Sequence, residues 1–185
     1  MEFCKTAIDG VLILKPKVFP DDRGFFFESY SEKNFLEEGL FLDFVQDNIS
    51  FSKKGTVRGL HYQVGEFAQG KLCQVLSGKV LDVAVDVRFN SPTFGQHVVV
   101  ELSEDNHNQI WIPPGFAHGF SVLSDTAIFH YKCTAFYSKQ DERAILFNDS
   151  DLNIDWKVDA LNISEKDLKG KSFKDIDKDF IFSDF

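Results

Sequence analysis

Short runs of strand-forming residues, separated by turn residues, are the feature that most constrains the fold of this chain. Residues 80–87 (Val-Leu-Asp-Val-Ala-Val-Asp-Val) alternate apolar with polar or small side chains, which is the period of a half-buried strand. A turn signal at 77–79, Ser-Gly-Lys, precedes them. Further candidate strands lie at 10–16, 23–30, 44–52, 60–64, 71–76, 96–102, 109–112, 120–123 and 127–136. Many short strands of this kind are typical of a β-sandwich or barrel, so we expect an all-β fold.

Helical signals are few, and they predict only short helices. A possible N-cap at Ser31 and a glycine at position 39 bound one of them. From position 148 onward the composition changes to Asp, Lys and scattered apolar residues, and Ser164 and Asp167 have the spacing of a capping box. We expect the region 148–185 to form a short helical segment packed on the barrel, followed by a mobile acidic tail.

Composition narrows the class of protein. A chain of 185 residues without visible repeats or linkers predicts one domain over 1–185. Its net charge of -9 argues against a nucleic-acid partner held through phosphate contacts, although local cations can still hold a small phosphorylated ligand. The three cysteines have no paired metal or disulfide spacing, which favours reduced thiols. Because no apolar stretch has the length of a membrane helix or a signal peptide, we expect a cytoplasmic protein without a membrane partner.

Two segments concentrate the residues that can do chemistry. His61 follows a glycine-containing strand start, and His118 follows a Pro-Pro-Gly turn. This pattern suggests the two halves of a cupin-type jelly roll, whose interior side chains meet in one lumen. Cupin metal sites use two histidines one residue apart plus a carboxylate, but here Tyr62 and Gln63 follow His61 and only Glu66 could stand in. Since catalytic zinc sites need about three well-placed ligands, we expect no metal.

The spacing of Arg58 and His61 raises a question about the strand that holds them. Strict alternation places the two side chains on opposite faces, unless Gly59 marks a bulge. Taken as an isolated pair, they are more simply a surface arginine and a hydrogen-bonded core histidine. The remaining motifs favour a functional interpretation instead.

Several motifs extend, in order, along the chain to about residue 168. They are Asp-Arg-Gly-Phe-Phe-Phe-Glu at 22–28, Gln-Asp-Asn-Ile-Ser at 46–50, Arg-Gly-Leu-His-Tyr-Gln at 58–63, Ser-Pro-Thr-Phe-Gly at 91–95, Trp-Ile-Pro-Pro-Gly-Phe-Ala-His-Gly-Phe at 111–120, Tyr-Lys-Cys-Thr at 131–134 and Ser-Glu-Lys-Asp at 164–167. Together they resemble one family, the dTDP-4-dehydrorhamnose 3,5-epimerases, which are metal-independent cupins of dTDP-L-rhamnose synthesis.

The resemblance implies an all-β, cupin-type jelly-roll barrel with a few short helices, and an epimerase without cofactor or metal. The implied reaction converts dTDP-4-dehydro-6-deoxy-D-glucose to dTDP-4-dehydro-L-rhamnose. The C4 ketone acidifies the hydrogens at C3 and C5, so inversion needs a base on one face, an acid on the other and a cation near the enolate oxygen. The family also implies a homodimer, in which an N-terminal segment of one subunit contributes to the partner's site.

The resemblance assigns the catalytic positions. His61 is the base, and its ordinary pKa near 6.5 suits proton abstraction around neutrality. Asp167 would orient the imidazole, although it could equally be a helix-capping acid, or both. Lys71 matches the lysine near the C4 oxygen, and Tyr131 matches the proton donor.

The resemblance also assigns substrate-binding positions. Arg23, Arg58 and Lys166 match contacts to the nucleotide or sugar, and the arginine fork suits phosphate oxygens. Odd positions of 129–137 share a strand face, so Tyr137 is assigned to stacking on thymine, with Phe136 as the neighbouring alternative. Further binding positions are Glu28, Gln46, Asp47, Asn48, His118 and Glu142, the last of which could also belong to a solvated charge run.

Two alternatives to this function stay open. An epimerase that inverts only C3 or only C5, or that accepts another nucleotide-linked 4-keto-6-deoxy sugar, would use the same base and acid. A non-catalytic cupin sugar-binding module would have no reason to keep His61, Tyr131 and Asp167 together, which makes it the weaker alternative.

Overall fold

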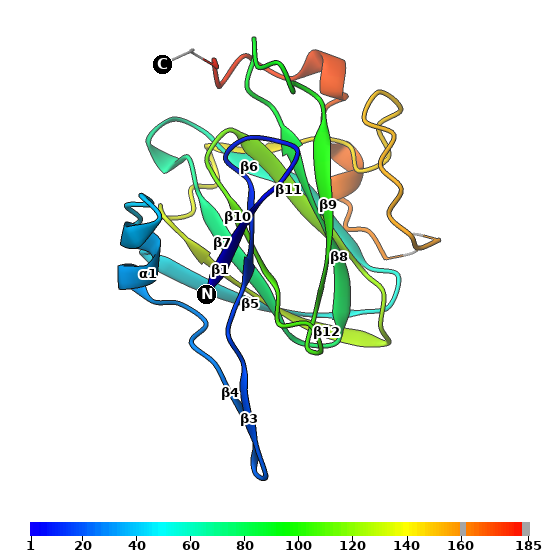
Figure 1. Ribbon diagram of the computed structural model, residues 1–185. Helices are drawn as coiled ribbons and strands as arrows, with labels where there is room; N and C mark the ends of the chain where they lie inside the picture. The colour runs from blue at the N-terminus through cyan, green and yellow to red at the C-terminus, as the bar shows by residue number, and fades with distance from the viewer. Residues whose placement is uncertain (160–161, 183–185) are drawn as a thin grey trace.

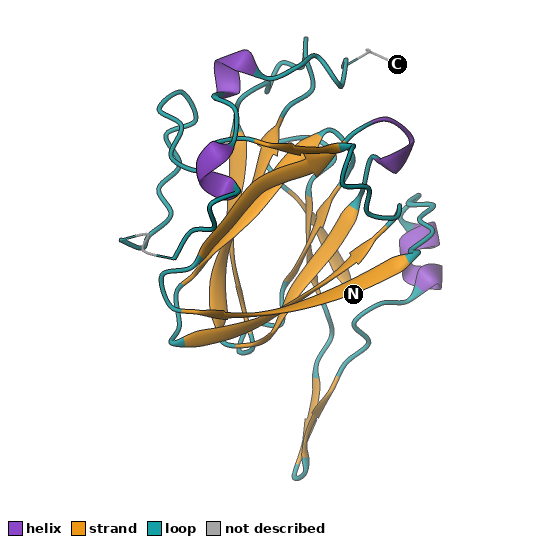
Figure 2. Ribbon diagram, turned by 180° about the vertical axis from the view of Figure 1, so that it is seen from behind, coloured by secondary structure: helices purple, strands orange, loops and turns teal. Residues whose placement is uncertain are grey.

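A computed structural model, which describes residues 1–159 and 162–182, folds into two facing β-sheets (Figure 1). The six-stranded sheet has the order β1-β2-β10-β7-β12-β5, and the five-stranded sheet the order β13-β6-β11-β8-β9. The strands of the two sheets are β1 (Glu2–Lys5), β2 (Leu12–Lys15), β5 (Gln46–Lys53), β6 (Val57–Gln63), β7 (Lys71–Ser77), β8 (Lys79–Asp86), β9 (His97–Ser103), β10 (Gln109–Ile112), β11 (Phe116–Val122), β12 (Thr126–Cys133) and β13 (Glu142–Ala144). The all-β jelly-roll prediction is confirmed, and Figure 2 shows both sheets curving around a common interior.

A separate hairpin, β3 (Phe19–Asp21) and β4 (Gly24–Phe26), projects away from the barrel (Figure 1). Sequence patterns predicted one strand over 23–30, but regular pairing ends after three residues of it. The sequence analysis also missed β1, β3 and β13, each of only three or four residues. Such segments are too short to display a period, so pairing with a neighbour decides their conformation.

The described residues contain little helix. The predicted short helix is α1 (Glu32–Glu37), which buries Phe35 but receives no side-chain cap from Ser31. Three short 3₁₀ turns, η1 (Gly65–Phe67), η2 (Asp167–Lys169) and η3 (Phe173–Asp175), complete the elements. No helix in these ranges is long and apolar enough to cross a membrane.

Strand β8 corrects the prediction of a half-buried strand at 80–87. Nearly every residue of β8 is buried, because the C-terminal segment covers its outer face, where Val83 and Val85 pack. The alternation is real, but its polar and small face, with Asp82 and Ala84, points into the barrel rather than to solvent. An interior of this kind leaves room and polar groups for a ligand.

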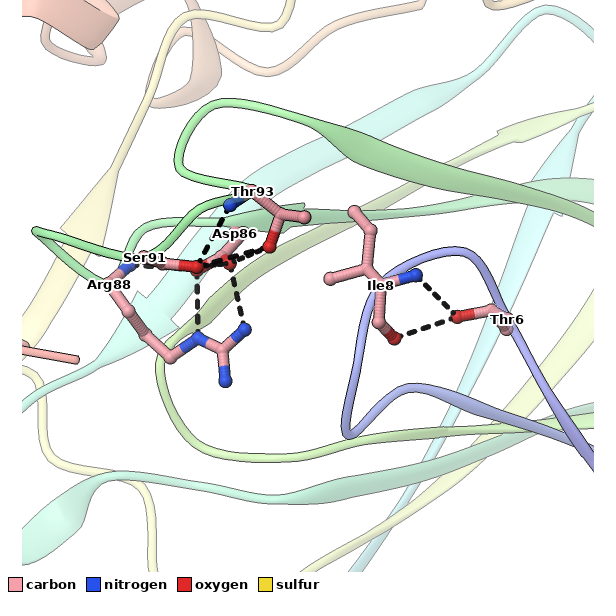
Figure 3. A network of polar contacts seen from close by, with 6 residues as sticks. All are labelled: Thr6, Ile8, Asp86, Arg88, Ser91 and Thr93. Atoms are coloured by element: carbon pink, nitrogen blue, oxygen red, sulfur yellow. Dashed lines mark hydrogen bonds and ion pairs between the residues drawn. The ribbon is translucent and has the colours of Figure 1, made fainter. Parts of the chain in front are cut away.

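Buried Asp86, at the end of β8, organises the loop that follows (Figure 3). Its carboxylate accepts hydrogen bonds from Arg88 Nε (2.9 Å), Ser91 Oγ (2.6 Å) and Thr93 Oγ1 (2.7 Å). Burial favours the neutral acid, but these hydrogen bonds outweigh it and hold the pKa of Asp86 below its ordinary value. The loop is therefore fixed by a charged group that burial makes costly to leave unpaired.

The C-terminal segment differs from the expected helix and mobile tail. Its described residues, 148–159 and 162–182, pack against the outer face of the five-stranded sheet, and the helical elements among them are 3₁₀ turns. Phe89 donates its backbone N–H to Phe180 (2.9 Å), and Phe182 donates to Phe89 (2.7 Å). The prediction of a free tail is therefore wrong up to residue 182, and its last three positions, 183–185, lie outside the described residues.

Candidate active site

The bulge that the sequence left open is present in β6. His61 pairs with His118 and Arg58 pairs with Phe120, so two residues of β6 lie opposite one residue of β11. The extra residue changes the alternation, and Arg58 and His61 consequently line the same cavity. The bulge thus explains how both side chains of this pair can serve one site.

Glycine is required at the bulge because two backbones meet there. Gly59 has a φ of +119°, and a Cβ on it would lie 2.5 Å from the Cα of Gly119 and 2.7 Å from the carbonyl oxygen of His118. A Cβ on Gly119 would in turn lie 2.7 Å from the carbonyl oxygen of Arg58. No larger residue fits this crossing without moving a strand.

His61 and Asp167 come together from segments 106 residues apart. The His61 Nε2 lies 2.7 Å from the Asp167 Oδ1, with the imidazole partly exposed to the cavity and the carboxylate buried. Burial raises the pKa of Asp167, but hydrogen bonds from His61, Ser164 and the Gly59 backbone outweigh it and leave the pKa below its ordinary value. An ionised carboxylate in this position orients the imidazole and stabilises its cation. Ser164 also accepts the Asp167 backbone N–H (3.1 Å), so Asp167 lies in a capped turn while its carboxylate contacts His61.

Tyr131 lies on the opposite sheet, on the inward face of β12. Burial raises the pKa of Tyr131 to about 12, so its hydroxyl keeps its proton at neutral pH and can act as a donor. Lys71 is on the neighbouring strand β7, where Cys133 pairs with it. The ammonium of Lys71 is therefore presented to the same interior as the phenol of Tyr131.

Two adjoining cavities, of about 240 and 270 Å³, share three lining residues: His61, Lys71 and Tyr131. The chamber that reaches the buried core residues Phe120 and Phe129, here called the deeper chamber, is also lined by Arg58, His118 and Asp167. The rim chamber is lined by Gln46, Asn48, Gln63, Gln69, Tyr137 and Glu142 as well. Three of the four predicted catalytic side chains thus lie at the junction, and the fourth, Asp167, contacts His61.

Charged and aromatic groups close the rim chamber on one side. The Lys166 Nζ lies 2.5 Å from the Glu142 Oε2, and the Tyr137 hydroxyl donates to the same oxygen (3.2 Å). Glu142 belongs to β13 and its side chain is mostly buried, so it is not part of a solvated charge run. Tyr137 reaches the chamber although β12 ends at Cys133, so strand alternation was the wrong reason for its placement. Phe136 is exposed and lines neither chamber.

Three predicted binding residues lie outside the chambers of this one subunit. Arg23 is at the exposed tip of the β3–β4 hairpin, bound to Asp21 (2.6 Å), and Glu28 lines a separate small cavity near the hairpin base. Asp47 is on the outer face of β5, where it accepts a hydrogen bond from Lys132 (2.9 Å). The binding roles of these three residues stay predictions, because a single subunit does not bring them to the chambers.

The sequence and the fold both match a known family. The sequence model described as dTDP-4-dehydrorhamnose 3,5-epimerase matches residues 5–175. The chain belongs to this family. It is 55% identical to the dTDP-4-dehydrorhamnose 3,5-epimerase of Shigella flexneri, over 96% of this chain and 98% of that protein. The Pseudomonas aeruginosa epimerase is 54% identical with the same coverage. The crystal structure of the Legionella pneumophila dTDP-6-deoxy-D-glucose-3,5-epimerase in complex with dTDP-4-keto-L-rhamnose is 48% identical, with a TM-score of 0.95 over 99% of both chains.

The sequence analysis missed several lining residues of this epimerase fold. Ser50 continues the inward face of β5 that begins with Gln46 and Asn48, so strand alternation could have included it. Gln63 is part of the β6 motif but received no role, and its Oε1 accepts the backbone N–H of Ser138 (2.9 Å). Gln69 lies in a loop two residues before Lys71, within a stretch rich in candidate functional residues, but it was given no role because no periodic signal exists there.

Proposed function

We propose that this protein is an isomerase that converts dTDP-4-dehydro-6-deoxy-D-glucose to dTDP-4-dehydro-L-rhamnose. The single observation that supports this best is the pairing of a base and an acid across one cavity. The imidazole of His61, held by Asp167, comes from the five-stranded sheet, whereas the phenol of Tyr131 comes from the six-stranded sheet. Inversion of a carbon needs proton removal on one face and delivery on the other, and two opposed walls supply that arrangement.

The reaction then follows from the charges of the site. His61 removes the proton from C5 or C3, and Asp167 stabilises the imidazolium that forms. The negative charge moves onto the C4 oxygen, where the Lys71 ammonium stabilises the enolate. Tyr131 gives a proton to the opposite face, and its raised pKa means that the phenol is the protonated form at neutral pH.

The two chambers together provide for the nucleotide end of the substrate. Arg58 and Lys166 line the deeper chamber, and Lys166 also reaches Glu142 of the rim chamber. Both are cations of an otherwise acidic protein, and both suit diphosphate oxygens. Tyr137 has a half-exposed ring beside them, which suits stacking on thymine. The remaining predicted contacts in the chambers, from Gln46, Asn48, His118 and Glu142, would hold the sugar and base by hydrogen bonds.

We further propose that the enzyme is a homodimer. The hairpin exposes Phe25 and Phe26, and the outer face of β5 exposes Ile49 and Phe51, so each of these two regions offers apolar side chains to a partner. A partner that receives the hairpin would also give Arg23 a pocket to act in, which the single subunit lacks. The three cysteines are free thiols, a state that a reducing cytoplasm favours, and we propose that location.

Deuterium uptake tests the proposed reaction. The enzyme is incubated in D₂O with dTDP-4-dehydro-6-deoxy-D-glucose, and the sugar is analysed by NMR and mass spectrometry. We expect deuterium at both C3 and C5 and a product with both centres inverted. Exchange and inversion at one carbon alone would make the enzyme a single-carbon epimerase, and no exchange at either carbon would refute the proposal.

A further inference from the structure

Three ligand-type side chains meet inside the barrel beside the proposed catalytic groups, since His118 pairs with His61 and Cys73 pairs with Tyr131 on neighbouring strands. They are Cys73 on β7, Asp82 on β8 and His118 on β11, so both sheets contribute. One ligand atom from each lies within 4.8 Å of the other two, and all three residues are buried. Among the described residues this is the one cluster of its kind.

The distances within the cluster are close to those of a metal site. The His118 Nε2 lies 2.9 Å from the Asp82 Oδ2 and 4.0 Å from the Cys73 Sγ. A tetrahedral zinc ion with ordinary bond lengths would set these separations at roughly 3.4 and 3.6 Å. Both separations from His118 thus differ by about half an ångström from those that a zinc ion would set.

The carboxylate of Asp82 has capacity for a cation. Both of its oxygens, at 3.0 and 2.9 Å, contact the same nitrogen of His118, which can donate one proton at most. Asp82 is fully buried, and a buried carboxylate is costly unless opposite charge neutralises it. A thiolate, a carboxylate and an imidazole together form a donor set that selects zinc-like ions over calcium or magnesium.

His118 connects the cluster to the substrate chamber. Its side chain lines the deeper chamber together with Lys71 and Tyr131, whereas Cys73 and Asp82 are fully buried and line neither chamber. An ion on the Nε2 would separate His118 from Asp82, now 2.9 Å away, and would shift the imidazole that lines the chamber. A divalent ion at this position would therefore weaken substrate binding instead of serving the reaction.

From this geometry we propose that Cys73, Asp82 and His118 form an inhibitory site for a divalent transition ion, with zinc as the physiological type. The inhibitory effect rests on the proposed epimerase function, but the binding itself does not. The set differs from the cupin arrangement considered from the sequence, because it uses neither His61 nor Glu66 and draws a cysteine from a neighbouring strand.

Cobalt substitution tests the binding. Purified protein is titrated with Co²⁺, and we expect a near-ultraviolet thiolate-to-cobalt charge-transfer band at one equivalent that added Zn²⁺ abolishes. Cys73→Val and the closer-sized Cys73→Ser should both lose the band. Cys133→Ala is the matched control, because this second buried cysteine lies outside the cluster, and it should keep the band. Absence of the band in the wild type, or its loss in Cys133→Ala alone, would overturn the site.

The inhibition is measured on the same variants. We expect Zn²⁺ to raise the apparent KM of the wild type and a chelator to reverse the effect, with at least a tenfold weaker effect on Cys73→Val. Equal zinc inhibition of wild type and Cys73→Val would refute the inhibitory role. If the protein has no epimerase activity, the cobalt spectrum still decides the binding, so the failure of each proposal can be recognised separately.

Discussion

The two walls of the substrate cavity are built in different ways. The wall that holds Tyr131 and Lys71 is regular where it carries these residues, since β12 pairs with β7 in unbroken register from Phe129 to Cys133 and the inward face there follows from alternation. The irregularity of this strand pair lies outside that stretch, between Ile128 and Phe129. The wall that holds His61 depends on a bulge at Gly59 and on a carboxylate, Asp167, from a distant 3₁₀ turn. A regular sheet suffices to place the proposed acid, Tyr131, but the proposed base, His61, needs an irregular strand and a long-range partner. The base wall should therefore be the more easily broken of the two.

The largest effect is expected from Gly59→Ala. The added Cβ would meet the Gly119 Cα at 2.5 Å, in a backbone conformation that L-residues rarely adopt. We expect a loss of about 3 kcal/mol or more in the free energy of unfolding, measured by urea denaturation, together with loss of activity.

Gly55→Ala is the matched control for Gly59→Ala. Gly55 also has a positive φ, +74°, but a Cβ there meets nothing within 4 Å. We expect a cost of about 1 kcal/mol from the backbone conformation alone. Equal losses of unfolding free energy in the two variants would show that the close contact between Gly59 and Gly119 does not determine the stability of this wall.

Asp167→Asn should damage the base wall without unfolding it. The amide is similar in size but cannot stabilise the imidazolium of His61, so we expect kcat to fall about 10²-fold or more, with a smaller change in KM. Steady-state kinetics with the natural substrate measure this split. A variant that keeps the wild-type kcat would remove Asp167 from the mechanism and leave it a turn-forming residue.

A smaller effect, on stability, is expected when the pH is lowered. It should act on the wall that holds His61 and Asp167. The pKa of Asp167 is below its ordinary value in the folded protein, so the stability it contributes is fully present above that ordinary value, about 3.9. This contribution is lost as the pH falls through the lower folded value. Urea denaturation between pH 6 and about pH 3 should show a flatter pH dependence for Asp167→Asn than for the wild type. Parallel curves would contradict the assigned shift.

The contrast between the walls also explains what could be predicted from the sequence. Alternation predicted the all-β fold and the inward face of β12 that carries Tyr131, because strand period is a local property. Asp167 could be placed opposite His61 only through family resemblance, since the contact joins residues 106 positions apart. The inward direction of Asp82 was missed for a related reason. A half-buried pattern does not show which face the C-terminal segment will cover.

The division of labour between the walls is tested most directly by comparing exchange with inversion in two variants. In D₂O, His61→Ala should lose both deuterium incorporation and epimerisation, because no base forms the enolate. Tyr131→Phe should still incorporate deuterium at the face that His61 serves, while its epimerisation falls by about 10²- to 10⁴-fold. Mass spectrometry gives the exchange rate and NMR gives the configuration. A Tyr131→Phe enzyme that inverts its substrate at the wild-type rate, or that loses exchange and inversion equally, would contradict the assignment of base and acid to opposite walls.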